Sequence, residues 1–129
     1  MASSARTAAE LLLPSRGGSR ARRSAAVEDN PSFQALWDRV SAIPCGQVST
    51  YGAVARAAGL PGRARLAGLA LRLAPPEMHV PWHRVVGAGG RIVFPKTSRH
   101  YREQAKRLRA EGVAINNSRV GRAWILVED

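Results

Sequence analysis

Several features are scarce in this chain of 129 residues, and each scarcity excludes a class of protein. The single cysteine, Cys45, cannot form an internal disulfide, so a reducing compartment is the default expectation. No hydrophobic run approaches the roughly 20 residues that cross a bilayer, so we expect no membrane-spanning role. The 9 acidic residues are scattered and do not suggest the carboxylate pair that glycoside hydrolysis uses.

The scarcity of acidic residues leaves a large positive charge. The chain has 20 Lys and Arg against 9 Asp and Glu, which gives a net charge of +11. A polyanion such as nucleic acid is therefore the leading class of partner, ahead of an acidic membrane surface. Residues 1–30 hold five arginines and three acidic residues, so a charge of +9 belongs to the rest of the chain.

Length and composition indicate one domain preceded by an arm. The length fits a single domain of the commonest size, roughly 100–150 residues. Residues 1–30 are rich in Ala, Ser, Gly and Arg and lack sustained apolar periodicity. We interpret them as a flexible basic N-terminal arm, and residues 31–129 as the domain. The start also resembles an organelle transit peptide, although its acidic residues are atypical of one. We expect a cytoplasmic protein, associated with the nucleoid in a bacterium, or a nuclear or organellar protein in a eukaryote.

Local signals predict three helices in the first half of the domain. Asn30 followed by proline is typical of a helix start, and apolar residues at helical spacing predict a helix over residues 32–42. Thr50 has the character of an N-cap, which predicts a second helix over residues 51–58. After a Gly- and Pro-rich turn, a third helix is predicted over residues 63–73.

The second and third helices have the outline of a helix-turn-helix. On the third helix, the residues expected to pack inward are Leu66, Leu69, Ala70 and Leu73. The opposite face holds Ala64, Arg65, Gly68 and Arg72. Small residues and arginines together allow a close approach to DNA, although an ordinary solvated arginine face would look the same on this helix alone.

The second half of the domain is predicted to add two short β elements and a helix. The glycines at 87–90 lack the spacing of a phosphate-binding loop, so we expect a hairpin turn leading into a β-like stretch over residues 91–94. A fourth helix is predicted to end at residue 110, before Gly112. Residues 113–127 predict a second hairpin that packs on the core. The fold class is therefore mainly α, a winged helix-turn-helix-like DNA-binding domain with a short β-hairpin.

Cys45 and His83 are the residues that a search for catalysis would select. They could form a nucleophile and base, but nothing in the Pro-Cys-Gly turn marks an activated thiolate. His79 and His83 could join Cys45 as metal ligands, but Pro81 between the histidines breaks the helix that would place them together. We expect no metal, no cofactor and no catalytic group.

Three segments resemble, in order, the motifs of the DNA-binding domain of O6-alkylguanine-DNA alkyltransferases. They are residues 43–52 (IPCGQVSTYG), residues 64–68 (ARLAG) and residues 80–86 (VPWHRVV). The resemblance covers about residues 32–113. The transferases accept the alkyl group on a cysteine in a Pro-Cys-His-Arg sequence, and this chain has Trp82 there. Indole offers one N–H donor and no nucleophile.

This departure makes the chain similar to the alkyltransferase-like proteins. The similarity implies a non-enzymatic sensor that binds O6-alkylguanine in double-stranded DNA and flips the nucleotide out of the helix. It also implies that the lesion is passed to nucleotide excision repair proteins, and we expect the sensor to be a monomer.

The resemblance also implies roles for individual residues. Arg65 matches an arginine that enters through the minor groove and fills the space of the flipped nucleotide. Tyr51 matches a tyrosine that crowds the phosphate beside the target. The residues expected around the lesion are Pro81, Trp82, His83, Arg84 and Lys96, and those expected along the DNA are Tyr51, Ala64, Arg65, Gly68 and Arg72. Glu111 matches a glutamate that would hold His83 in place.

Two further departures concern the lesion pocket. The transferases usually carry an asparagine where this chain has Ala74. Some alkyltransferase-like proteins sense the guanine with a basic residue at a position that corresponds to Pro95, so Lys96 or Arg91 is the expected substitute. Two other functions stay open: an active transferase that uses another nucleophile such as Cys45, and a helix-turn-helix transcriptional regulator that reads sequence in the major groove.

Overall fold

The computed structural model describes residues 27–126, so nearly all of the predicted arm lies outside the described residues. By its contacts, the chain divides into two units between residues 34 and 35. The predicted boundary at residue 30 stays a prediction. Within residues 27–126, no helix has the length and hydrophobicity needed to cross a membrane.

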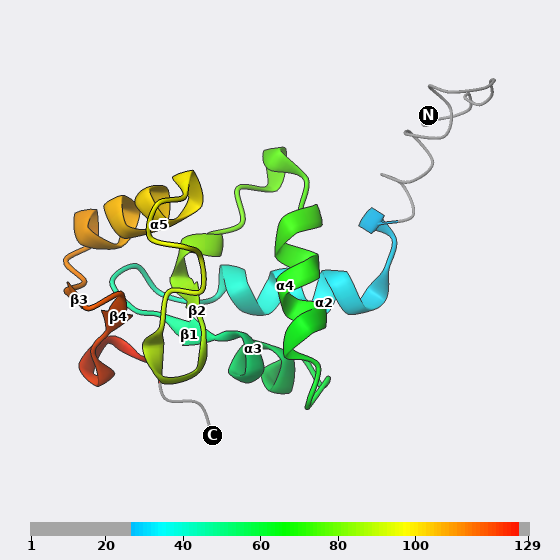
Figure 1. Cartoon of the computed structure of the whole chain (residues 1–129). Helices are drawn as coiled ribbons and strands as arrows, with labels where there is room; N and C mark the ends of the chain where they lie inside the picture. Colours follow the sequence, from blue (N-terminus) through cyan, green and yellow to red (C-terminus); the bar gives the residue numbers. More distant parts are fainter. Residues whose placement is uncertain (1–26, 127–129) are drawn as a thin grey trace. The chain divides into compact units, whose positions relative to one another are not determined.

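The described part is mainly helical, which confirms the predicted fold class. Its α-helices are α2 (Pro31–Ser41), α3 (Tyr51–Ala57), α4 (Ala64–Leu73) and α5 (Arg99–Ala110). Its strands are β1 (Ser49–Thr50), β2 (Val85–Val86), β3 (Ile115–Asn116) and β4 (Arg119–Val120). Short 3-10 helices are η1 (Pro76–Met78), η2 (Trp82–Arg84), η3 (Ala88–Gly90) and η4 (Arg122–Trp124). Strands β1 and β2 lie between α5 and the α3–α4 pair (Figure 1).

Side-chain caps begin the helices where the sequence predicts. Asn30 Oδ1 accepts hydrogen bonds from the backbone N–H groups of Ser32 at 2.9 Å and Phe33 at 3.2 Å. Thr50 Oγ1 accepts from Ala53 N at 3.1 Å. Both predicted N-caps are therefore confirmed. Each cap satisfies backbone donors that have no partner within the first helical turn.

The strand pairing differs from the prediction at the glycines. Strand β2 does not form a hairpin with the residues after the glycine turn; it pairs in parallel with β1, with Ser49 opposite Val85. Arg91 pairs instead with Arg119 of β4. The reason is the compact turn η3, where Gly90 has φ +88° and lies so close to the Val120 carbonyl that a Cβ would collide with it. The turn thus directs the chain toward β4.

The second hairpin is confirmed. Strands β3 and β4 pair antiparallel through a turn in which Asn117 and Ser118 have positive φ angles. After it, the chain returns to β1, where Val48 N–H donates to the Trp124 carbonyl at 2.8 Å. A buried cluster joins this end of the chain to α5 and the strands. Its members are Val48, Val86, Leu108, Val113 and Val120, with Ile115, Trp124 and Ile125 packed against them.

The inward face predicted for helix α4 is right for Ala70 and wrong for Leu73. Ala67 and Ala70 are buried, whereas Leu73 is 42% exposed, so the inward position predicted for Leu73 is wrong. The physical reason lies in α2, where the buried Trp37 donates its Nε1–H to the Ala70 carbonyl at 2.7 Å. The small Ala70 therefore lies against Trp37, whereas Leu66 and Leu69 are half-buried and Leu73 is turned toward solvent.

Candidate nucleic-acid interface

Helices α3 and α4 form the predicted helix-turn-helix. Gly59 and Gly62, with φ angles of +83° and +80°, turn the chain between them. The Tyr51 ring, from the first turn of α3, lies against α4 at Gly68, where a Cβ would be 3.9 Å from the ring carbon Cε1. Burial raises the pKa of the Tyr51 phenol, so the hydroxyl stays neutral beside an anion. Gly68 thus lets the predicted phosphate-contacting residue sit against the second helix.

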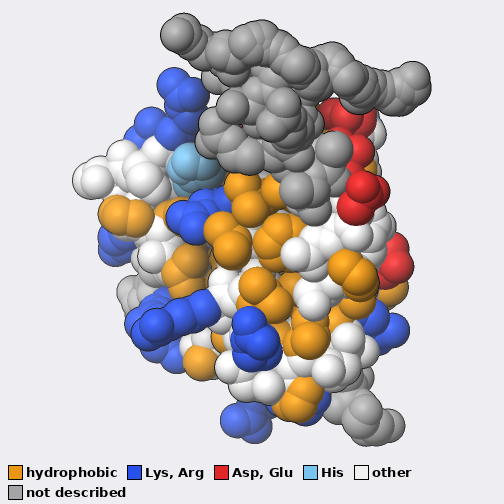
Figure 2. Space-filling view, turned by 90° about the vertical axis from the view of Figure 1, so that its right-hand side faces the viewer, with side chains coloured by type: hydrophobic (Ala, Val, Ile, Leu, Met, Phe, Trp, Pro, Cys, Tyr) orange, Lys and Arg blue, Asp and Glu red, His pale blue; other side chains and the backbone are white. Residues whose placement is uncertain are grey.

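The outer side of α4 is basic and partly apolar. Arg63, Arg65 and Arg72 are exposed, and none of them forms an ion pair with another residue of the described part. A shallow hollow lies at the start of the helix, lined by Gly62, Arg63, Ala64, Arg65, Leu66 and Leu69. On the face drawn in Figure 2, Lys and Arg side chains stand among and beside hydrophobic side chains. Such a surface attracts the phosphates of DNA and can lie close to its groove.

Trp82 is the centre of an aromatic cluster that the sequence analysis did not foresee. Its ring makes edge contacts with His83, Phe94 and His100 at centroid distances of 6.3, 6.1 and 6.3 Å. Phe94 and His100 stack on each other at 5.2 Å. The Arg107 guanidinium carbon lies 5.5 Å from the centre of the Trp82 ring. His100 and Arg107 share one face of α5 by their spacing of seven, but only the tertiary fold brings that face to Trp82.

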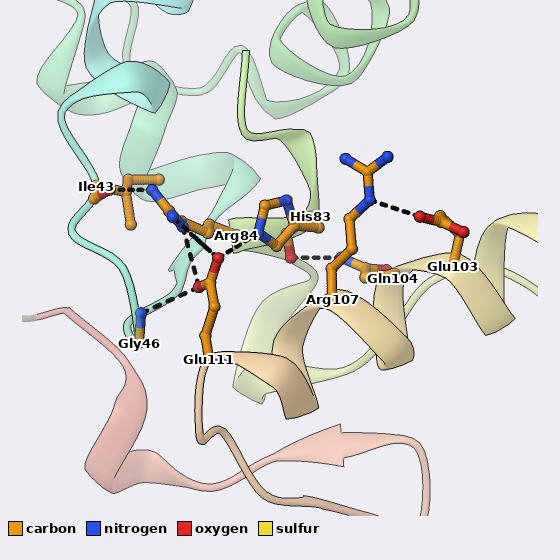
Figure 3. A network of polar contacts seen from close by, with 8 residues as sticks. All are labelled: Ile43, Gly46, His83, Arg84, Glu103, Gln104, Arg107 and Glu111. Atoms are coloured by element: carbon orange, nitrogen blue, oxygen red, sulfur yellow. Dashed lines mark hydrogen bonds and ion pairs between the residues drawn. The ribbon is translucent and has the colours of Figure 1, made fainter. Parts of the chain in front are cut away.

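His83 and Arg84, next to Trp82, belong to a polar network centred on Glu111 (Figure 3). His83 Nε2 lies 2.7 Å from Glu111 Oε2, and Arg84 Nη2 donates to the same oxygen at 2.9 Å. The Gly46 N–H donates to Glu111 Oε1 at 3.0 Å. Arg84 also donates to the Ile43 carbonyl at 2.9 Å. One carboxylate therefore joins η2 to the loop that precedes β1.

The charges of this network follow from its contacts. Burial alone would raise the pKa of Glu111, but hydrogen bonds from Arg84, from the Gly46 N–H and from His83 outweigh burial and lower that pKa to about 2. The hydrogen bond to Glu111 raises the pKa of Arg84. Burial lowers the pKa of His83, although Glu111 opposes the shift, so the imidazole is neutral at pH 7.

The Nδ1 atom of the neutral His83 ring has no hydrogen-bond partner among the described residues. The Glu111 carboxylate can only accept, so the neutral imidazole carries its hydrogen on Nε2. Nδ1 is then a bare acceptor, buried and without a hydrogen-bond partner in residues 27–126. The buried Gln104 of α5 fixes the backbone around the ring, because its Nε2 donates to the carbonyls of His83 at 3.1 Å and Val85 at 2.9 Å.

The structure separates the other predicted residues from the aromatic cluster. Lys96 and Arg91 are exposed, and neither has a described contact with Trp82. Arg84 points to Glu111 and Ile43, as described above. Cys45 is exposed in the loop beside Gly46 and has no described contact with His83. Among residues 27–126, no group of His, Cys, Asp or Glu side chains is placed to hold a metal ion.

A helix pair with an arginine-bearing second helix is the arrangement of a helix-turn-helix DNA-binding domain. Comparison with known families gives the same class, because residues 31–113 match the DNA-binding domain of 6-O-methylguanine DNA methyltransferase. The chain belongs to this family, which confirms the resemblance seen in its motifs.

Similar proteins in the family include an alkyltransferase-like protein and a DNA base-flipping protein. The chain is 43% identical to alkyltransferase-like protein 1 of Schizosaccharomyces pombe, over 69% of this chain and 82% of the relative. It is also 43% identical to the DNA base-flipping protein of Escherichia coli, over 71% of this chain and 70% of the relative. Among solved structures, S. pombe Atl1 in complex with damaged DNA containing O6-carboxymethylguanine matches with a TM-score of 0.66 and 36% identity, over 75% of this chain and 95% of that chain.

Proposed function

We propose that this protein is a non-enzymatic sensor of O6-alkylguanine in double-stranded DNA. The observation that carries the proposal is Trp82, which by the motif resemblance corresponds to the alkyl-accepting cysteine and which forms the centre of the aromatic cluster. The names of its relatives support the proposal, since they describe an alkyltransferase-like protein and a base-flipping protein. An S. pombe relative of similar fold has been crystallised with damaged DNA.

Helix α4 and Tyr51 open the duplex in the proposed mechanism. The arginines of α4 attract the DNA backbone, and Tyr51 presses on the phosphate beside the target nucleotide. Rotating a nucleotide out of the stack costs a few kcal/mol, and least for a damaged pair. Arg65, exposed at the start of α4, enters through the minor groove and fills the space that the nucleotide leaves.

The extruded base is held at Trp82 and is not repaired there. Pro81 and Trp82 offer it an apolar and aromatic wall. Trp82 has no nucleophilic atom, so the alkyl group stays on the base. His83 and Glu111 then act as structural supports: their hydrogen bond fixes the backbone that follows Trp82. The exposed Cys45 has no described contact with Trp82 or His83, and it precedes Gly46, whose N–H donates to Glu111.

The output of such a sensor is a bound, distorted lesion. A protein that holds an alkylated base without changing it serves repair only if other proteins act on the complex. We therefore propose that the complex, with the protein as a monomer, is passed to nucleotide excision repair proteins.

The test compares the binding of two duplexes that differ only in one O6-methylguanine. The dissociation constant is measured by fluorescence anisotropy for the wild-type chain, Arg65→Ala and Arg63→Ala. Arg63 is the matched control, because it is an exposed arginine two residues away. We expect a preference for the lesion that Arg65→Ala abolishes, whereas Arg63→Ala weakens both duplexes alike, as the loss of a phosphate contact does.

Two results with these duplexes, one from binding and one from mass spectrometry, would contradict the proposal. Equal affinity for both duplexes, with a preference that follows sequence instead, would indicate a transcriptional regulator. A gain of one methyl group on Cys45, found by mass spectrometry after incubation with the lesion, would indicate an active transferase.

A further inference from the structure

We propose that Arg107 of α5 is the residue that reads the extruded purine, through the N7 edge of the base. The inference rests on the proposed function and names a contact within it. From the sequence, Lys96 or Arg91, which follow the glycines, are the residues expected to sense the guanine. The structure instead brings a different cation to Trp82, from helix α5, which lies outside the three motif segments but within the region that the family match covers.

Arg107 is held over Trp82 from two directions. Its guanidinium carbon lies 5.5 Å from the centre of the indole ring, within the range of a cation–π contact. Its Nε donates to Glu103 Oε2 at 2.6 Å, one helical turn earlier on α5. These two contacts set the plane and the direction of the guanidinium. A side chain with this many rotatable bonds would otherwise be spread over many rotamers.

The terminal nitrogens of Arg107 have no acceptor among residues 27–126. Neither Nη1 nor Nη2 forms a hydrogen bond with a residue of the described part, and Figure 3 shows both pointing away from Glu103. The side chain is 47% exposed, so an incoming ligand can reach these nitrogens. The geometry therefore presents two terminal N–H donor groups over the Trp82 ring, where we propose that the base is received.

The chemistry of the base matches this pair of donors. Arginine to the N7 and O6 atoms of guanine is the commonest specific contact in DNA recognition. Alkylation converts O6 to an ether oxygen, a weaker acceptor, while N7 keeps its lone pair. Arg107 would then donate to N7 as its main partner. A pyrimidine has no such acceptor, so the contact selects a purine.

Other cations near the cluster do not share this geometry. Lys106 and Arg109 lie on the same helix and are exposed, but neither has a described contact with an aromatic ring. Arg109 is therefore a control for the general attraction of α5 to DNA: it carries the same charge on the same helix. A merely solvated Arg107 would behave as Arg109 does.

The test uses three duplexes with the wild-type chain, Arg107→Met, Arg107→Lys and Arg109→Met. One duplex carries O6-methylguanine, one carries its 7-deaza analogue, which lacks the N7 acceptor, and one is unmodified. We expect the wild type to bind the 7-deaza lesion about tenfold more weakly than the ordinary lesion, in the range of one arginine–guanine contact. Arg107→Met should bind both lesions equally and weakly, whereas Arg109→Met should keep the wild-type ratio. Arg107→Lys keeps the charge but not the planar pair of donors, so it should recover affinity for all three duplexes without the ratio.

The results separate this inference from the proposed function. If the wild type binds the unmodified duplex as well as the lesion, the proposed function fails. Suppose instead that the wild type prefers the lesion. If Arg107→Met still binds the 7-deaza lesion more weakly than the ordinary lesion, or has the same dissociation constants as Arg109→Met, the assignment of Arg107 is overturned. The sensor function stands in both cases. Circular dichroism of each variant verifies the fold.

Discussion

Replacing Glu111 with glutamine should destabilise the folded chain strongly at neutral pH. Glu111 accepts hydrogen bonds from two separate segments, the loop at Gly46 and the 3-10 helix that holds His83 and Arg84, and only 13% of its side chain is exposed. Its pKa falls from 4.5 to about 2 on folding. That difference corresponds to about 3 kcal/mol of folding free energy when the carboxyl is ionised. Glu111→Gln also leaves the guanidinium of Arg84 without an anionic partner, so an effect of this order is expected.

The pH dependence supplies the sign of the effect. Because the pKa of Glu111 is lower in the folded chain, its contribution is complete above the unfolded pKa and is lost as the pH falls toward 2. The wild type and Glu111→Gln should therefore differ most near neutral pH and converge in acid. Thermal unfolding followed by circular dichroism measures this difference. At neutral pH the variant should melt about 10–20 °C lower.

The matched control is Glu103→Gln. The ion pair of Glu103 with Arg107 is 41% and 47% exposed, and pairs of this kind contribute little to stability. This control should melt as the wild type does. Two results would refute the reasoning about Glu111: a Glu111→Gln melting temperature equal to that of Glu103→Gln, or a difference from the wild type that does not shrink in acid.

Two glycines give further predictions, each with a matched control. Gly90→Ala should lower the free energy of unfolding, measured in urea, by more than Gly59→Ala. Both glycines have positive φ, but only a Cβ at residue 90 meets the Val120 carbonyl. Equal decreases in the free energy of unfolding would contradict this close approach. Gly68→Leu should weaken binding to unmodified DNA, as measured by anisotropy, because its side chain would displace the Tyr51 ring, whereas Gly68→Ala fits at 3.9 Å and should bind as the wild type does.

Helices were the predictable part of this fold because their signals are local. Asn30 and Thr50 act on backbone groups two or three residues away, so the sequence around them is sufficient to place α2 and α3. The start of α4 was predicted within one residue, because glycines with positive φ precede it. In each case the cause and the effect lie within one helical turn.

The errors all concern contacts between distant segments. Leu73 has the spacing of a core residue but is exposed. The side of α4 that faces the core includes Ala70, whose carbonyl accepts from Trp37, a residue 33 positions earlier in the chain. The parallel pairing of Ser49 with Val85 likewise has no local signal, since two-residue strands show no alternation. Periodicity identifies a face of a helix but not the element that covers it.

The site was predictable only as far as its motifs extend. The motifs led to Trp82 and, through the resemblance, to the pairing of His83 with Glu111, which the structure places 2.7 Å apart. Phe94, His100 and Arg107 lie outside the motifs, and their contacts with Trp82 come from the docking of α5 onto η2. Their residue types alone carry no signal of such a cluster.

The short ladder between β1 and β2 has a consequence for how a lesion is found. Thr50 is both the last residue of β1 and the cap of the helix that begins with Tyr51, while β2 starts directly after the turn that holds Trp82. The ladder therefore connects Tyr51, which we propose presses on the phosphate, to Trp82, which we propose receives the base. We expect Tyr51 and Trp82 to keep a constant separation when the protein binds DNA. The DNA must then provide the movement, so base pairs that open readily would be sampled first.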